Sequence, residues 1–375
     1  MYHHIGVDLH KDSMTIATTS DEDSKMKVKK IPCKCIGKVT EFFSQFSGQE
    51  CRVLVEAVGF YHWFWDAVSP LVAEMVLVNA TEARKYSANE PKTDPRDARK
   101  LAELSLNGEI NRNPCLRVFV PDHKLRALRE ATRHRHQIAR SLAQARNRFR
   151  RYLLKNNFPG PKVLDSASIQ KWLATWEERL SPFHLFALRQ LEDQILTLSR
   201  QERDAQGVVE KMMEEPDYRK SAERFFTAPG IGKVAAPTII AEVGDFKRFS
   251  DPQRLTSFAG LAPRVFQSGE HCRHGRITKK GPSNLRWILQ QAAWVAIRED
   301  DHVRKIFTRI SRRAGKKKAA TAIARKILCW LWTMERNQAN FREERKETTW
   351  DRNERPAVTL TGFMGPTPLG QSPIA

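Results

Sequence analysis

The pattern of apolar and polar positions over about the first 120 residues predicts strands that alternate with helices. Five short apolar runs have the length of strands: residues 4–8, 14–19, 26–31, 52–56 and 75–79. A polar stretch at about 38–47 and an aromatic-rich stretch from about Tyr61 have helical character and lie between these runs. This order predicts a mixed α/β domain at the N-terminus.

From Leu125 to Leu154 the pattern becomes helical and strongly basic. Steps of three and four alternate along one set of positions: Leu128, Ala131, Arg135, Ile138, Leu142, Ala145, Phe149 and Tyr152. A second set has the same spacing: Leu188, Leu191, Ile195, Leu198, Glu202, Ala205, Val209 and Met212. Such heptad seams predict coiled-coil packing, within one chain or between two, and simple intramolecular helix packing is an equal alternative.

The C-terminal part is predicted to be mainly helical. Pro229-Gly-Ile-Gly232-Lys233 leads into an apolar helix from Val234 to Glu242, and such a turn can present backbone N–H groups to a phosphate. The segment resembles a helix-hairpin-helix element and lacks the upstream glycine of a Walker A loop. Further expectations are a helix start at Ser250 with Ser250 as its cap, a basic hairpin or loop at 264–278, a helix at 284–299 and a disordered tail at 342–375.

Charge adds a function class to this architecture. The chain has 64 Lys and Arg residues against 43 Asp and Glu residues, a net charge of +21. Three stretches hold the excess, residues 124–155, 264–286 and 304–318, and this clustering is typical of nucleic-acid backbone contacts, although any one stretch can be a solvated face. The residues expected to contact nucleic acid are Arg133, Arg140, Arg146, Arg150, Gly230, Gly232, Lys233, Arg273, Arg276, Lys279 and Lys280.

Other classes of protein are disfavoured. No run of ~18 apolar residues that could cross a membrane occurs, and the first residues lack the layout of a signal peptide. The six cysteines have no C-x-x-C spacing and do not indicate a disulfide framework. We therefore expect a reduced, cytoplasmic protein directed at nucleic acid.

Four carboxylates are candidates for catalysis. Asp8 and Glu56 each end an apolar strand, and Asp94 and Asp97 share one face if their segment is helical. Four carboxylates at one place would repel each other without a divalent cation, and Mg²⁺ prefers oxygen ligands of this kind. The structural alternative is that Asp94 caps a helix with Pro95 at its first position, and that Asp8 and Glu56 are ordinary strand-end residues. The residues alone leave this choice open.

Several motifs together carry a resemblance to a known family. In the N-terminal half they are Gly6-Val-Asp8-Leu-His-Lys11, Val55-Glu56-Ala-Val-Gly59, Val78-Asn79 and Lys92-Thr-Asp94-Pro-Arg-Asp97-Ala98. In the C-terminal half they are Pro229-Gly-Ile-Gly232, Ala241-Glu-Val-Gly-Asp245, Phe258-Ala-Gly-Leu-Ala-Pro263, Gln267-Ser-Gly269, Gly275-Arg-Ile-Thr-Lys-Lys-Gly281 and Leu285-Arg286. The chain resembles the insertion sequence 110 family of transposases, the DEDD recombinases, from about residue 4 to 335. It departs from the family pattern at Val58, Ala80 and Pro282, none of which is a catalytic group.

The resemblance implies a fold and a mechanism. It implies a RuvC-like, RNase H-like DEDD domain at 1–120, a basic coiled-coil region at 121–215 and a transposase domain with a serine nucleophile at 216–341. Asp8, Glu56, Asp94 and Asp97 would hold Mg²⁺. Family members use a structured bridge RNA that pairs with donor and target DNA, so both nucleic acids are implied partners. A homodimer or homotetramer, acting on the nucleoid of a bacterial cytoplasm, is expected because four strands must be cut and exchanged.

The resemblance assigns the nucleophile to Ser268 in Gln-Ser-Gly, with Ser257 and Ser283 as the next candidates. A serine before glycine is otherwise a common turn residue, and a hydroxyl needs a base or a metal for activation. The carboxylates could provide that activation if the two domains meet, and attack on DNA would leave a 5′-phosphoserine ester. His271, Cys272 and His274 fit no standard zinc spacing, so we expect phosphate contacts around them instead.

Two other functions remain open at this stage. A RuvC-like Mg²⁺-dependent junction endonuclease would use water as its nucleophile and would keep cleavage when Ser268 is replaced by alanine. A non-catalytic nucleic-acid-binding protein would be insensitive to Mg²⁺. We expect the transposase, since the C-terminal motifs have no place in a simple junction nuclease.

Overall fold

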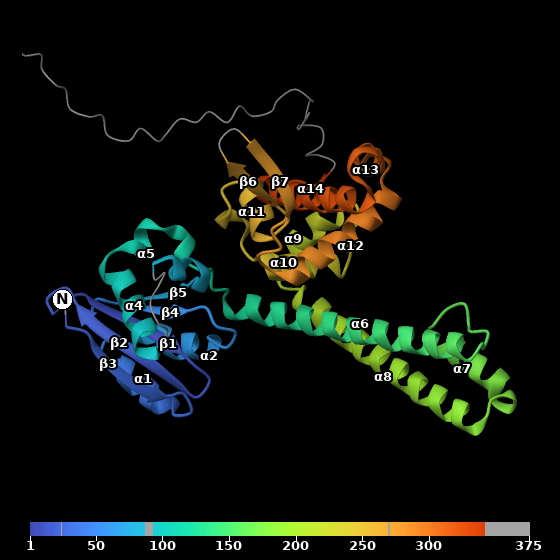
Figure 1. Ribbon diagram of the computed structural model, residues 1–375, viewed down its shortest axis with the longest axis horizontal. Coiled ribbons are helices and arrows are strands. Elements are labelled where there is room, and N and C mark those ends of the chain that lie inside the picture. The colour runs from blue at the N-terminus through green and yellow to red at the C-terminus, as the bar shows by residue number, and fades with distance from the viewer. Residues whose placement is uncertain (24, 87–92, 269–270, 342–375) are drawn as a thin grey trace, which may run out of the picture. The chain divides into compact units, whose positions relative to one another are not determined.

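A computed structural model describes residues 1–23, 25–86, 93–268 and 271–341, with the side chains of 265–274 outside the description. The chain divides into two compact units, Met1–Pro121 and Asp122–Ala375 (Figure 1). The predicted mixed α/β N-terminal part and the mainly helical remainder are confirmed. The predicted tail at 342–375 lies outside the described residues.

The first unit is built on one sheet with strand order β3-β2-β1-β4-β5. Its strands are β1 (His3–Leu9), β2 (Ser13–Ser20), β3 (Lys27–Pro32), β4 (Cys51–Glu56) and β5 (Glu74–Val78). β1 is central, antiparallel to β2 and parallel to β4, while β3 and β5 form the edges by antiparallel and parallel pairing respectively. All five predicted strands are therefore confirmed within two residues of their expected bounds.

Helices cover both faces of this sheet (Figure 1). Side chains of α1 (Ile36–Ser44) and α2 (His62–Val68) share one core with the odd-numbered residues of β1. Helix α4 (Asp94–Leu106) lies against β1, β2 and β4 on the other face. Residues of β1 alternate between these two environments, as expected for a strand buried on both sides.

Gly6 sets how closely α4 approaches β1. A Cβ atom at this position would lie 2.0 Å from the carbonyl oxygen of Ala98 and 2.5 Å from the amide nitrogen of Ala102. Only glycine allows the helix backbone to rest on the strand at this distance, because every other residue would place an atom inside the helix. The close approach fixes the position of α4 along β1.

The second unit begins with a long helical hairpin. Helices α6 (His123–Lys155) and α8 (Pro182–Met212) pack side by side (Figure 1), with α7 (Ser166–Trp176) against α8. The Tyr152 hydroxyl lies 2.8 Å from Nδ1 of His184, so the end of α6 meets the start of α8 and the pair is antiparallel. The two predicted heptad seams therefore pack against each other within one chain.

The two polar residues that interrupt these seams bind each other. The Arg135 guanidinium donates a hydrogen bond to the Glu202 carboxylate, and the two side chains are 15% and 22% exposed. Apolar seam residues on either side of the pair are buried, Leu128 and Val209 in one core and Leu142 and Ile195 in another. A partly buried ion pair in an otherwise apolar seam is a known way of selecting one register.

The C-terminal part surrounds one large apolar core. It contains α9 (Pro216–Phe226), α10 (Ala235–Val243), α11 (Pro252–Phe258), α12 (Ser283–Glu299), α13 (Asp301–Ala314), α14 (Lys316–Asn337) and the hairpin β6 (Pro263–Ser268) to β7 (His271–Ile277). Every residue of α10 is buried, so this helix lies at the centre. Leu128 of α6 and Val209 of α8 join the same core, which roots the helical hairpin in this part of the chain.

Short helical segments complete the chain. They are α3 (Ala80–Ala83), α5 (Glu109–Arg112), η1 (Ser69–Leu71), η2 (Arg84–Tyr86), η3 (Pro114–Leu116), η4 (Glu177–Arg179) and η5 (Phe246–Arg248). The predicted cap at Ser250 is wrong by one residue. Asp251 is the N-cap of α11, and its carboxylate accepts hydrogen bonds from the backbone N–H groups of Gln253 and Arg254. Across the part of the chain that the structure describes, no helix is long and apolar enough to span a membrane.

The ion pair in the hairpin leads to a stability prediction. Replacing Glu202 with alanine leaves the partly buried Arg135 charge without a partner. This change is expected to lower the free energy of unfolding by about 1–3 kcal/mol. The double substitution Arg135→Leu with Glu202→Leu is expected to recover most of this loss, since leucines continue the apolar seam. Urea denaturation of the full chain followed by circular dichroism measures both effects.

Arg203→Ala is the matched control, because this neighbouring arginine is exposed. A change within about 0.5 kcal/mol is expected for it. If the double variant is as unstable as Glu202→Ala alone, the idea that leucines can replace this ion pair in the apolar seam is wrong.

Candidate metal centre and basic surfaces

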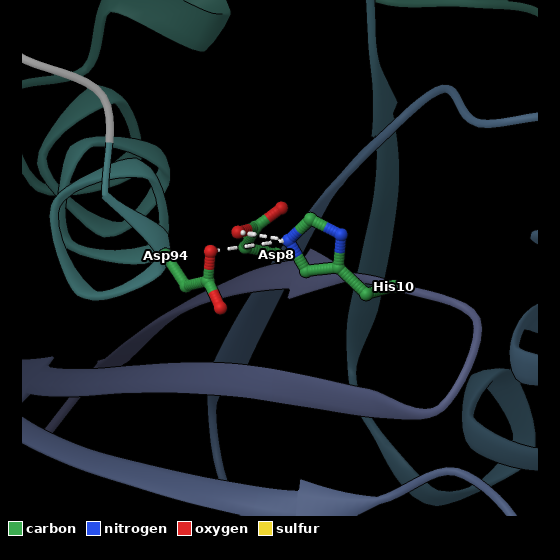
Figure 2. Close-up of side chains that lie close together, drawn as sticks. All are labelled: Asp8, His10 and Asp94. Atoms are coloured by element: carbon green, nitrogen blue, oxygen red, sulfur yellow. Dashed lines mark hydrogen bonds and ion pairs between the residues drawn. The ribbon is translucent and has the colours of Figure 1, made fainter.

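Two aspartates from separate elements meet at the carboxyl end of β1 (Figure 2). Asp8 lies near the end of β1 and is 7% exposed, and Asp94 is the first residue of α4. His10 follows β1, and its Nε2 lies 3.0 Å from Oδ2 of Asp8 and 3.4 Å from Oδ1 of Asp94. One ligand atom from each of the three residues lies within 4.8 Å of the others.

The opposite directions of β1 and α4 bring Asp94 to Asp8. At the start of β1, His4 Nδ1 lies 2.8 Å from Oγ of Ser105, near the end of α4. In the middle of the strand, Gly6 touches the backbone at Ala98. The helix therefore begins where the strand ends, and its first turn is level with Asp8.

The alternative in which Asp94 caps α4 is wrong. Thr93 is the N-cap residue and makes no side-chain capping bond, while Asp94 and Pro95 occupy the first two helical positions. The Asp94 carboxylate is directed instead at His10 and at Lys30, whose Nζ lies 3.6 Å from Oδ2. The carboxylate is consequently available as a ligand.

Glu56 and Asp97 approach the same edge of the sheet. Val7 is paired with Val55 across the parallel strands, so the next residues, Asp8 and Glu56, are level and share a face. Asp97 lies in the first turn of α4, and its charge raises the pKa of Asp8. Among the described residues, the closest group contains Asp8, His10 and Asp94 and does not include Glu56 or Asp97.

The environment disfavours the charged form of Asp8. Burial raises the pKa of its carboxyl, and the nearby charges of Asp97 and Asp94 raise it further. The charge of His10 and its hydrogen bond oppose this effect. A buried carboxylate beside like charges is a common arrangement at metal sites and catalytic centres.

The donor set fits a divalent metal. Carboxylate oxygens suit hard cations such as Mg²⁺, and an imidazole nitrogen is also accepted by transition metals. His10 was not among the residues predicted for the site. The available signal was its position two residues after Asp8, because side chains at i and i+2 of a strand share a face.

A second polar cluster in the same unit is structural. His4 lies between Ser105 and Asp21, with Nε2 3.0 Å from the Asp21 carboxylate. This order of groups superficially matches a catalytic triad. Ser105 is only 2% exposed and His4 only 5%, so no substrate can reach the hydroxyl. The cluster ties α4 to β1.

Ser268 is the last residue of β6, where its backbone is opposite His271 of β7. The predicted basic hairpin at 264–278 is confirmed as these two strands. The side chains of Ser268, His271, Cys272, Arg273 and His274 lie outside the described residues, so their roles remain predictions. Ser257 on α11 and Ser283 at the start of α12 are both exposed.

The other residues predicted to bind nucleic acid have different surroundings. Arg133 makes two hydrogen bonds of 2.8 Å to Glu242, which is 1% exposed. Arg150 donates to Asn147 at 3.4 Å, and Lys233 Nζ lies 3.8 Å from the Glu210 carboxylate. Arg146 is partly buried, and the other described cations are exposed, namely Arg140, Arg276, Lys279 and Lys280.

The two predicted glycines differ in their constraints. Gly230 has φ +78°, and a Cβ atom there would lie 2.2 Å from the carbonyl oxygen of Ala292. Gly232 has open space around it. Gly230 is therefore required by the packing of the turn against α12, while Gly232 leaves the backbone accessible before α10.

Comparison with known proteins gives two family matches in order along the chain. A transposase family, the DEDD domain of the IS110 type, matches residues 5–159, and the IS116/IS110/IS902 transposase family matches residues 222–308. The first match contains the carboxylate cluster and the second contains the β6–β7 hairpin.

Individual proteins resemble the chain over most of its length. The transposase for insertion sequence element IS1328 of Yersinia enterocolitica is 24% identical over 294 residues, 78% of this chain and 83% of that protein. The transposase for insertion sequence element IS1533 of Leptospira borgpetersenii is 24% identical over 344 residues, 89% of this chain and 96% of that protein. A Sinorhizobium fredii protein, y4qE, is 28% identical over 226 residues, and the chain spans 52% of it.

These matches, together with the carboxylate cluster, place the chain among the transposases. More narrowly, it belongs to the IS110/IS116 family of insertion-sequence transposases. Transposases of this kind act on DNA, which agrees with the predicted nucleic-acid partner.

The raised pKa of Asp8 predicts a stability effect. A carboxyl whose folded pKa exceeds its unfolded pKa binds more protons in the folded state, so stability falls as pH rises between the two values. Asp8→Asn removes this penalty and is expected to stabilise the metal-free protein at pH 7 by about 0.5–2 kcal/mol. Below the unfolded pKa, the two proteins should have equal stability.

Thermal unfolding in EDTA across a pH series measures the difference. Asp12→Asn is the control, since the Asp12 side chain is 74% exposed and lies just beyond the same strand. Its stability should match the parent protein at every pH. A destabilised Asp8→Asn protein at neutral pH would contradict the charge penalty assigned to Asp8.

Proposed function

We propose that this chain is a bridge-RNA-guided DNA recombinase that uses a serine nucleophile and carboxylate-bound Mg²⁺. The observation that carries the proposal is the meeting of Asp8 and Asp94, from a strand end and a helix start, with His10 between them. The strand order β3-β2-β1-β4-β5 supports an RNase H-like, RuvC-like fold for the first unit. In that fold, the carboxyl end of the central strand is the position expected for catalytic carboxylates.

The proposed ligands of Mg²⁺ are Asp8, Glu56, Asp94 and Asp97, and His10 lies close enough to join them or to bind a reacting phosphate. Mg²⁺, when bound, would neutralise the carboxylates and stabilise negative charge on phosphate oxygens. Burial of Asp8 excludes water from one side of the cluster and strengthens its electrostatic interactions. Lys30, 3.6 Å from Asp94, is placed to contact a DNA phosphate at the same edge.

Ser268 is the proposed nucleophile. Its Oγ would bond to a DNA phosphorus and lose its proton to a base, while the bond to the 3′ oxygen breaks and releases a 3′-hydroxyl. The product is a 5′-phosphoserine ester. Because the ester keeps the energy of the phosphodiester bond, rejoining to a new strand requires no nucleotide cofactor. This chemistry therefore favours transfer of the DNA end to a new strand over hydrolysis of the DNA.

The guide and the assembly are further parts of the proposal. A structured bridge RNA would pair with donor and target DNA, and the exposed cations Arg140, Arg276, Lys279 and Lys280 are available for its backbone and that of DNA. Cutting and exchanging four strands requires more than one protomer, so we propose a homodimer or homotetramer. Its site of action would be the nucleoid in a bacterial cytoplasm.

Metal binding has a direct thermal test. At a Mg²⁺ or Mn²⁺ concentration of ~100 times the dissociation constant, binding to the folded state should add ~2.7 kcal/mol to stability. Asp94→Asn is expected to remove most of this metal-dependent gain and to abolish DNA cleavage, because a charged ligand is lost. Differential scanning fluorimetry with a metal titration measures the first effect, and a plasmid cleavage assay measures the second.

Asp217→Asn is the matched control, since Asp217 is an exposed acid in the first turn of α9. It removes the same interaction with a helix dipole without touching the cluster. An Asp94→Asn protein that retains the full metal-dependent gain would remove Asp94 from the ligand set.

The nucleophile is tested by trapping the covalent intermediate. Ser268→Ala is expected to lose the protein–DNA adduct on a denaturing gel and all strand exchange, while RNA and DNA binding persist. Ser257→Ala and Ser283→Ala should retain the adduct. Retained cleavage by Ser268→Ala without any adduct would instead support the junction endonuclease.

A further inference from the structure

A cavity in the second unit is not used by the proposed chemistry. It has a volume of about 810 Å³ and lies between the middle of α6 and the first turns of α12. Its lining residues are Arg133, His136, Gln137, Ala139, Arg140, Ala143, Pro282, Ser283, Asn284 and Trp287. No acidic side chain is among them.

One wall of the cavity is aromatic. The Trp287 side chain belongs to α12 and remains 39% exposed. The His136 ring from α6 lies against it, with ring centroids 4.1 Å apart and planes at 59°. A large flat ring left open to water beside a cavity is a platform on which another π system can stack.

His136 has one polar atom that is neither solvent-accessible nor paired with a described residue. Its Nδ1 is buried and has no hydrogen-bond partner in the described part of the chain. Burial lowers the pKa of the imidazole, and the charges of Arg135 and Arg140 lower it further. The neutral ring can donate or accept one hydrogen bond, and leaving such a buried group unpaired costs ~1–3 kcal/mol.

Two arginines of α6 add positive charge to the lining, Arg133 three residues before His136 and Arg140 four residues after it. Arg140 is exposed and makes no ion pair or hydrogen bond with any residue that the structure describes. Arg133 is held in place by its two hydrogen bonds to Glu242, and Nδ2 of Asn284 lies 3.5 Å from the same carboxylate. The Arg133 charge is thus balanced within the protein, whereas the Arg140 guanidinium is free to bind a phosphate.

We propose that this cavity binds one unpaired nucleotide of a nucleic-acid strand. The base stacks on the exposed part of Trp287, and the adjoining phosphate binds Arg140. This inference rests on the proposed nucleic-acid function and adds a subsite to it. A duplex cannot use the site, because its bases are stacked on each other, whereas a loop or a displaced strand can.

The test compares single strands with duplex. Full-length protein is titrated into fluorescent single-stranded RNA, single-stranded DNA of the same sequence, and the matching DNA duplex, at one fixed salt concentration. Trp287→Ala is expected to weaken single-strand binding by ~10- to 100-fold, as loss of one stacked base implies. Duplex binding should be unchanged, and Trp287→Phe should retain most single-strand affinity.

Trp294→Ala is the matched control. Trp294 lies on the same helix, is 40% exposed and does not line the cavity. Its single-strand affinity should equal that of the parent protein. A probe strand containing 2-aminopurine should lose fluorescence by stacking on the parent protein, and lose less on Trp287→Ala. Greater effects on RNA than on DNA would identify the RNA as the source of the nucleotide, and the reverse would identify DNA.

The charged half of the site has a separate signature. Arg140→Gln should reduce the slope of log affinity against log salt for single strands by ~0.7, the value for one phosphate, whereas Trp287→Ala should leave the slope unchanged. Equal losses on duplex and single strands, or no loss for Trp287→Ala, would overturn the subsite.

These outcomes are separable from the recombinase proposal. If Trp287→Ala binds single strands normally while the Ser268-dependent adduct still forms, only the subsite proposal is wrong. If Trp287→Ala weakens single-strand binding as expected but neither an adduct nor metal-dependent cleavage is seen, the serine mechanism is wrong and the subsite proposal stands.

Discussion

The contact of Gly6 with the backbone of α4 is the constraint on which the candidate metal centre depends. It allows the helix to rest on the central strand with no side chain between them, and that contact sets the height of the helix along the strand. Because strand and helix run in opposite directions, the start of the helix is level with the strand end. Asp94 therefore reaches Asp8, although 85 residues of chain lie between them in sequence.

The cluster formed in this way is unfavourable for the protein without a cation. Burial and two neighbouring acids raise the pKa of Asp8, and His10 opposes them. Structural ion pairs usually satisfy their charges within the protein, as Glu242 does with Arg133. A site that keeps excess negative charge at a buried strand end is organised for binding a positive partner rather than for stability.

The second unit contains a cavity with an unpaired positive charge, whereas the first unit contains a cluster with excess negative charge. In its hairpin, Arg135 and Glu202 pair across the seam, while Leu128 of α6 and Val209 of α8 are part of the C-terminal core. His136 follows Arg135 directly and is thereby brought against Trp287 of α12. The position of this cavity thus follows from the packing of α6, and the free guanidinium of Arg140 favours a negatively charged ligand.

Local patterns in the sequence were enough to predict the strands, the two heptad seams and the basic hairpin, because each depends on neighbouring residues and on side-chain periodicity. The same patterns made the four carboxylates candidates but left the choice between metal ligands and structural residues open. Tertiary structure alone decided the rest. The direction of the Asp94 carboxylate toward His10 and Lys30, the pairing of Arg135 with Glu202 and the cavity at Trp287 all depend on segments distant in sequence. Their positions follow from packing between elements, which no local pattern encodes.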